Sequence, residues 1–122
     1  MIIAIDGTAG TGKGTISKLV SERLGFVYVD TGAMYRALTL KFIREHISLD
    51  DIGKIQEILK STSISFNKQQ EVLLDGENVN AEIRAPEISE LVPKVSSIPI
   101  VREKLVEEQR KLGNQSNIIM EN

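Results

Sequence analysis

A glycine-rich loop near the amino terminus limits what this chain can fold into. The segment GTAGTGKGT follows the apolar residues 1–5 and precedes apolar residues at helical spacing, which are Ile16, Leu19, Val20 and Leu24. An isoleucine-rich run is typical of a strand buried on both faces, and Gly25 stands where a glycine commonly ends a helix. The pattern therefore predicts a buried strand, a tight loop and a helix in direct succession.

The loop itself matches the pattern G-x-x-x-x-G-K followed closely by a hydroxyl residue. Its glycines allow successive backbone N–H groups to point at one anion, the next helix adds the positive end of its dipole, and Lys13 adds a full charge. We therefore expect a cradle for nucleotide phosphates, made of Gly7, Thr8, Ala9, Gly10, Thr11, Gly12, Lys13, Gly14 and Thr15. Gly14 stands where many such loops have a Ser or Thr ligand of Mg²⁺, so phosphate oxygens and water should hold the metal. A mobile glycine turn with a solvated lysine is the plainer alternative.

A second strand and helix follow the first pair. Residues 26–29 are again apolar, the stretch DTG turns the chain at residues 30–32, and helical spacing resumes at Met34. Two such units predict an α/β fold with a parallel sheet and right-handed crossovers. Because parallel strands end at one edge of the sheet, this turn and the first loop should face one crevice. Arg36, early in the second helix, would bind a second anion there.

The middle of the chain has a different character. Residues 50–60 have the spacing of a short amphipathic helix, and SISFNKQQEVLLDGENV holds two apolar runs and a DG pair, which is a strong hairpin signal. We expect a small antiparallel meander there.

Two prolines predict the starts of two further helices. Pro86 opens one helix and Pro99 opens another, which we expect to end at Gly113. A polar loop at residues 114–117 then leads into residues 118–120, a predicted core strand. The whole middle is therefore expected to be an insertion on an α/β core.

Composition and charge exclude several classes of partner. The 122 residues are 41% hydrophobic and 26% charged, and 15 basic against 17 acidic residues give a net charge of -2. This balance gives no general attraction to nucleic acid or to an anionic membrane. The sequence has no cysteine and shows neither a secretory leader nor a membrane-spanning run, so we expect a cytoplasmic protein without nucleic-acid or membrane partners.

Taken together, the motifs resemble those of the bacterial cytidylate kinase family. The resemblance rests on GTAGTGKGT, VDTGAMYRAL, DGENVNAEIR and PIVREKLVEEQRK, in that order along essentially the whole chain. It implies a P-loop NTPase parallel-sheet core, incomplete here, in residues 1–36 with 114–122 as a further strand. It also implies an inserted α+β nucleoside-monophosphate-binding region in residues 37–113. The implied reaction transfers the γ-phosphoryl group of ATP, with Mg²⁺, to CMP or dCMP and gives CDP or dCDP.

The resemblance also implies roles for single residues. Lys13 and Arg36 would be catalytic, with Lys13 neutralising charge on the moving phosphoryl group and Arg36 binding the CMP phosphate. The implied substrate-binding residues are Asp30, Thr31, Arg36, Arg84 and Arg102, and Glu121 would hold the metal through a water molecule. Each arginine also fits a solvated helix surface, and Asp30 also fits a helix cap.

The sequence departs from the family pattern in two places. Pro93 stands where the family has a serine that contacts cytosine. In the family's D-G-R-D-like stretch, Glu121 stands for the first acid, Asn122 replaces the glycine, and the arginine and the second aspartate are missing. We therefore expect a truncated N-terminal fragment without the lid, inactive on its own, of a protein that is a monomer at full length. The alternative is a non-catalytic nucleotide-phosphate-binding module or a pseudokinase.

Overall fold

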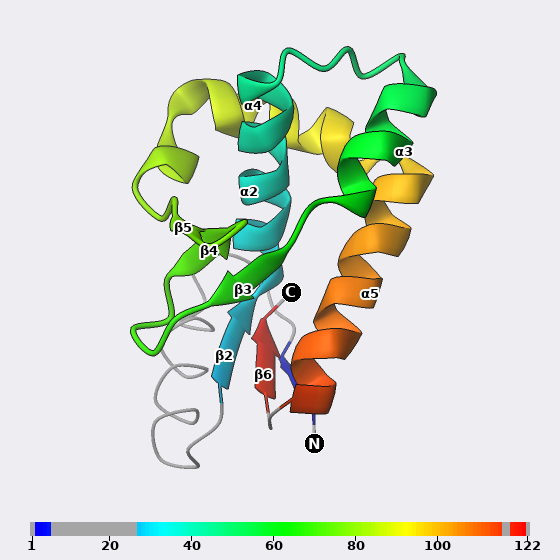
Figure 1. The fold of residues 1–122 in the computed structure, drawn as a ribbon. Coiled ribbons are helices and arrows are strands. Elements are labelled where there is room, and N and C mark those ends of the chain that lie inside the picture. Colours follow the sequence, from blue (N-terminus) through cyan, green and yellow to red (C-terminus); the bar gives the residue numbers. More distant parts are fainter. Residues whose placement is uncertain (1, 6–26, 116–117, 122) are drawn as a thin grey trace.

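The computed structural model describes residues 2–5, 27–115 and 118–121 of the chain (Figure 1). The glycine-rich loop at 7–15 and the helix expected after it lie outside these residues. In chain order, the described elements are β1 (Ile2–Ile5), β2 (Val27–Asp30), α2 (Thr31–Arg44), α3 (Ile52–Lys60), β3 (Ile64–Phe66), β4 (Val72–Leu74), β5 (Glu77–Asn78), the 3₁₀ helix η1 (Glu82–Arg84), α4 (Pro86–Ser96), α5 (Pro99–Gln115) and β6 (Ile118–Glu121).

The parallel sheet has the strand order β1-β6-β2. The strand predicted at 118–120 is therefore confirmed, and it lies between the first two strands of the chain. Its register places Glu121 beside both Ile5 and Asp30, so the three strands end level with one another. Because all pairs are parallel, the segments that leave β1 and β2 start at the same edge of the sheet.

Helix α2 leaves β2 without an intervening loop and forms the centre of the core. Asp30 is its N-cap, and Lys41 and Arg44 lie in its last turn, where positive charge suits the helix dipole. Apolar residues recur along one face at helical spacing, and Met34 and Leu38 are fully buried. Other elements pack around this face, with buried residues that include Ile55, Leu59, Val72, Leu74, Ile88, Val95, Val101 and Leu105.

The predicted meander is present as the antiparallel sheet β3-β4-β5. Ile64 pairs with Leu74 in the first hairpin, and Asp75 and Gly76 form the turn between β4 and β5 with φ angles of 50° and 86°. Two successive positive φ values are what a tight hairpin turn requires, and Asp-Gly supplies them at low cost. The DG signal therefore identified the turn correctly.

Helices α4 and α5 begin at Pro86 and Pro99, as predicted. The predicted end of the second helix at Gly113 was wrong, because α5 continues to Gln115. Leu112 packs against the core and keeps the last turn in place, and a glycine lowers helix propensity without ending a helix by itself. In Figure 1, α5 runs along one side of the molecule toward β6, and α3 lies beside it.

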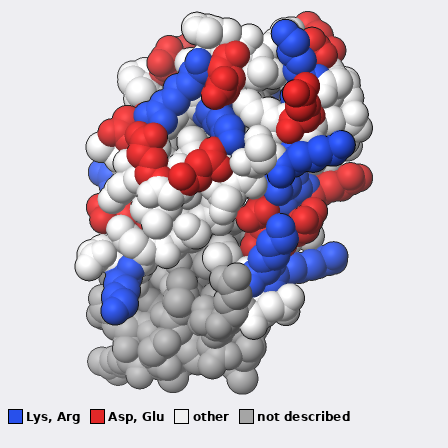
Figure 2. Space-filling view, in the orientation of Figure 1, with Lys and Arg blue, Asp and Glu red and all other residues white. Residues whose placement is uncertain are grey.

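The described surface carries charges of both signs. Figure 2 shows Lys and Arg side chains interspersed with Asp and Glu side chains rather than gathered into one patch. Among the described helices, none is both long and apolar enough to cross a membrane.

Candidate functional site

A pocket of about 440 Å³ opens where β2 ends and α2 begins. It is bounded by the end of β2, the first turns of α2, the segment after β5, η1 and α4. The lining residues are Asp30, Gly32, Ala33, Arg36, Asn80, Ile83, Arg84 and Ser89. The pocket therefore lies between the parallel sheet and the middle region of the chain.

The start of α2 forms one wall of this pocket. Oδ1 of Asp30 accepts a hydrogen bond from the backbone N–H of Ala33 at 3.1 Å, which is a typical N-cap contact. A Cβ atom added at Gly32 would lie only 3.2 Å from this oxygen, so a larger residue would press on the capping carboxylate. The stretch DTG thus allows a close cap and presents the positive end of the helix dipole to the pocket.

Arg36 reaches across the pocket from α2 to two other elements. Its Nη1 donates hydrogen bonds to the carbonyl oxygen of Ile83 in η1 at 3.2 Å and to Oγ of Ser89 in α4 at 2.9 Å. The guanidinium group is therefore held in place from two sides. Arg36 is partly exposed, so it remains accessible to a ligand.

Arg84 adds a second positive charge to the same pocket. It ends η1, lines the pocket and is exposed. The lining then has two guanidinium groups and one helix N-terminus against the single carboxylate of Asp30, of which one oxygen already accepts from Ala33. This arrangement favours an anion, and guanidinium groups suit phosphate oxygens in particular.

Other predicted site residues lie elsewhere. Thr31 is the first residue of α2, has an exposed fraction of 8% and does not line the pocket. Arg102 lies on α5 and lines a separate hollow of about 350 Å³ with Glu103, Val106 and Arg110. Of the predicted substrate-binding set, the structure brings together Asp30, Arg36 and Arg84 in one pocket.

The structure describes only a small part of the predicted donor and metal sites. Lys13 and the rest of the loop at 7–15 lie outside the described residues. The backbone of Glu121 lies beside that of Asp30 at the end of the parallel sheet. Within the described ranges, no three acidic, histidine or cysteine side chains gather in a way that could hold a metal ion.

Sequence reasoning missed Asn80, Ile83 and Ser89. Ser89 lies in the first turns of the helix that Pro86 opens, so its place on a helix was predictable. Its contact with Arg36 joins residues 53 positions apart, and no local pattern indicates that contact.

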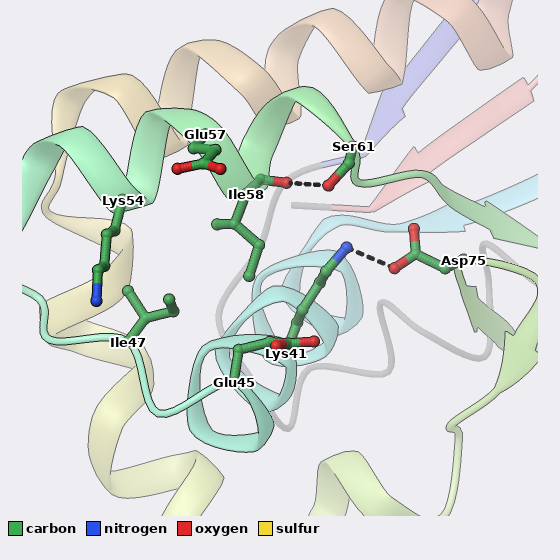
Figure 3. A pocket seen from close by; sticks show the side chains of 8 residues that line it. All are labelled: Lys41, Glu45, Ile47, Lys54, Glu57, Ile58, Ser61 and Asp75. Carbon is green, nitrogen blue, oxygen red and sulfur yellow. Dashed lines mark hydrogen bonds and ion pairs between the residues drawn. The ribbon is translucent and has the colours of Figure 1, made fainter.

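A second pocket, also of about 440 Å³, lies between the end of α2, α3 and the turn after β4 (Figure 3). Its lining mixes lysine and acidic side chains over two isoleucines, Ile47 and Ile58. Lys41 and Asp75 form an ion pair of 2.6 Å across it. The two side chains therefore neutralise each other's charge within the pocket.

Comparison with known proteins agrees with the architecture. The family model described as cytidylate kinase matches residues 3–122. The cytidylate kinase of Caldanaerobacter subterraneus subsp. tengcongensis is 53% identical over 119 residues, which cover 98% of this chain and 53% of that protein. The cytidylate kinase of Caldicellulosiruptor bescii is 51% identical over 122 residues, covering 98% and 54%.

A fused relative shows the same similarity. The bifunctional pantoate ligase/cytidylate kinase of Prochlorococcus marinus strain MIT 9312 is 50% identical over 124 residues, which cover 98% of this chain and 24% of that protein. The chain spans about half the length of the cytidylate kinases it matches. It belongs to the cytidylate kinase family, whose fold is the α/β fold of P-loop NTPases.

Proposed function

We propose that this chain is the N-terminal part of an enzyme that transfers the γ-phosphoryl group of ATP to CMP or dCMP, giving CDP or dCDP. The observation that carries the proposal is the pocket in which Arg36, Arg84 and the start of α2 surround one space. A nucleoside monophosphate brings a dianionic phosphate, which two guanidinium groups and a helix N-terminus would bind well. The relatives compared above are named cytidylate kinases, so cytidylate is the acceptor in those proteins.

In this proposal the acceptor phosphate lies against Arg36, while Asp30 and Thr31 shape the turn that supports it. Arg84 contributes charge from η1. Arg102 would approach the nucleoside from α5, although its hollow is separate from the pocket. Residues 37–113 would then act as the nucleoside-monophosphate-binding region, and residues 1–36 with 114–122 as the core.

The donor would be held by the loop at 7–15. Support comes from the register of the parallel sheet, because β1 ends at Ile5, level with Asp30 at the end of β2. The loop follows β1 in sequence, so donor and acceptor sites would start from one edge. Phosphoryl transfer depends on in-line positioning and on cations at the transferring oxygens, which Lys13 and Arg36 would supply.

We also propose that Mg²⁺ takes part in the reaction, because this ion prefers oxygen ligands such as phosphates and carboxylates. Asp30 and Glu121 end neighbouring strands in register, and the described residues hold no cluster of three acids that would enclose a metal. We propose that Glu121 holds Mg²⁺ through a water molecule while phosphate oxygens supply the remaining ligands. When bound, the ion would neutralise charge on the donor phosphates.

A bisubstrate analogue that joins CMP to ATP tests the two-site arrangement. In calorimetric titrations, we expect Lys13→Ala and Arg36→Ala each to weaken its binding by roughly tenfold or more, because each removes a charge-assisted contact. Arg44→Ala is the matched control, since Arg44 lies on the same helix and pairs with Glu77 instead. Binding of ATP alone that ignores Arg36 would support a non-catalytic module, and a preference for GTP would contradict the proposal.

A turnover assay addresses catalysis by these residues. Because the chain spans about half the length of its relatives, we expect the 122-residue polypeptide to bind CMP without sustained CDP formation. Robust steady-state turnover would show that these residues suffice for the reaction. We further propose a cytoplasmic protein that is monomeric at full length, which sedimentation and fractionation would check.

A further inference from the structure

The two hydrogen bonds of Arg36 in the described structure come from the same nitrogen. Nη1 donates to the Ile83 carbonyl and to the Ser89 hydroxyl, so both of its hydrogens are used. A guanidinium group has five N–H donors, and the three that belong to Nη2 and Nε are not engaged by these contacts. Nη2 and Nε of Arg36 are therefore the nitrogens that remain for a ligand.

Occupation of Nη1 restricts how an anion can be bound. A phosphate accepts two parallel N–H groups either from Nη1 with Nη2 or from Nη2 with Nε. The first pair is blocked by Ile83 and Ser89. We propose that Ser89 is a positioning residue that directs Arg36 to bind the acceptor phosphate through Nη2 and Nε; this inference rests on the function proposed above.

Ser89 is suited to this task by its place in α4. Its neighbour Ile88 is fully buried, and Val95 anchors the next turns of the same helix in the core. The hydroxyl thus projects from a fixed backbone. With the Ile83 carbonyl as its one acceptor, the guanidinium group of Arg36 could still rotate about that hydrogen bond. The Ser89 hydroxyl, a second acceptor on another helix, fixes the orientation of the group before the ligand binds. Fixing a long side chain in advance removes an ordering cost from binding.

A purely structural role for the contact predicts a different outcome. If Ser89 only tied α4 to α2, its removal would change stability and would affect all ligands of the pocket alike. If it positions Arg36, its removal weakens the part of the affinity that depends on the phosphate. Comparison of CMP with cytidine, which has the same base and sugar but no phosphate, separates the two.

The experiment is an NMR titration of the 122-residue chain with CMP and with cytidine. We expect Ser89→Ala to weaken CMP binding about three- to tenfold, the loss typical of one hydrogen bond, and to leave cytidine binding unchanged. Ser89→Thr retains the hydroxyl and should stay within about twofold of the wild type. Ser96→Ala is the matched control, because Ser96 is on the same helix and donates to the Pro93 carbonyl instead.

A second measurement needs no ligand. Rotation about the Cζ–Nη1 bond of Arg36, followed by ¹⁵N NMR of the guanidinium group, should be faster in Ser89→Ala than in the wild type, with Arg36→Lys used for assignment. Equal rotation in both proteins overturns the inference, and so does an equal loss of CMP and cytidine affinity. A wild-type chain that fails to bind CMP overturns the proposed function, whereas CMP binding unaffected by Ser89→Ala overturns the Ser89 inference alone.

Discussion

Replacement of Asp75 tests how the meander is attached to α2. Both carboxylate oxygens of Asp75 are engaged, because Oδ1 accepts from the backbone N–H of Ser63 at 2.8 Å and Oδ2 pairs with Nζ of Lys41 at 2.6 Å. The residue also occupies the left-handed region, with φ of 50°. We predict that Asp75→Ala destabilises the protein far more than replacement of an exposed acid nearby.

The magnitude follows from three contributions. The hydrogen bond from Ser63 is worth about 1 kcal/mol. The side chain of Lys41 is only 12% exposed, so loss of its partner costs about 1 kcal/mol, the low end of the range because Asp75 itself is 39% exposed. Alanine in the left-handed region adds about 1 kcal/mol. We expect a loss of about 3 kcal/mol for Asp75→Ala and about 1 kcal/mol for Asp75→Asn, which retains Oδ1 and tolerates the backbone angle.

The assay is urea unfolding followed by far-ultraviolet circular dichroism, since the chain has no tryptophan. Glu77→Gln is the matched control, because the Arg44–Glu77 pair is 40% and 58% exposed and should contribute under about 0.5 kcal/mol. A loss for Asp75→Ala no larger than that for Glu77→Gln would refute the reasoning. It would show that the ion pair in Figure 3 stabilises the fold no more than a surface contact does.

Three further outcomes follow from the described contacts. Gly76→Ala should cost about 1 kcal/mol in urea unfolding, because φ is 86° while space for a Cβ is open. Glu108→Ala should lower the free energy of unfolding by about 2 kcal/mol, because Glu108 is 5% exposed and pairs at 2.9 Å with Lys104, which would be left without this partner. The hydrogen bond to Glu107 and the charge of Glu108 raise the pKa of Lys111 above 10.5. The contribution of charged Lys111 to stability should be present below pH 10.5 and be lost as the pH rises through the raised pKa. The melting temperatures of the wild type and of Lys111→Ala should therefore converge above pH 10.5.

Local signals in the sequence identified most of the elements. Asp75 and Gly76 marked the hairpin because few other residue pairs adopt two positive φ values cheaply. Pro86 and Pro99 marked helix starts. Proline has no backbone N–H, and this costs nothing in the first turn of a helix, where the N–H groups have no partner within the helix. Asp30 followed a buried strand and capped the next helix, as its side chain and place suggested.

Contacts between distant segments could not be predicted in the same way. The partners of Arg36 lie 47 and 53 residues further along the chain, and packing of α4 on α2 brings them together. Likewise, the sequence showed that residues 118–120 form a strand but not that this strand separates β1 from β2. Such contacts depend on which faces pack, and periodicity within one segment does not specify that.

The central place of β6 sets an order on folding. Both β1 and β2 pair with β6, so the parallel sheet cannot form before residues 118–121 are available. In contrast, α2, the meander, η1 and α4 can pack on one another earlier. The entropy cost of closing so long a loop grows slowly with length, but contacts between distant segments form late. During synthesis, the pocket around Arg36 would therefore form before the edge of the parallel sheet from which the proposed donor loop starts.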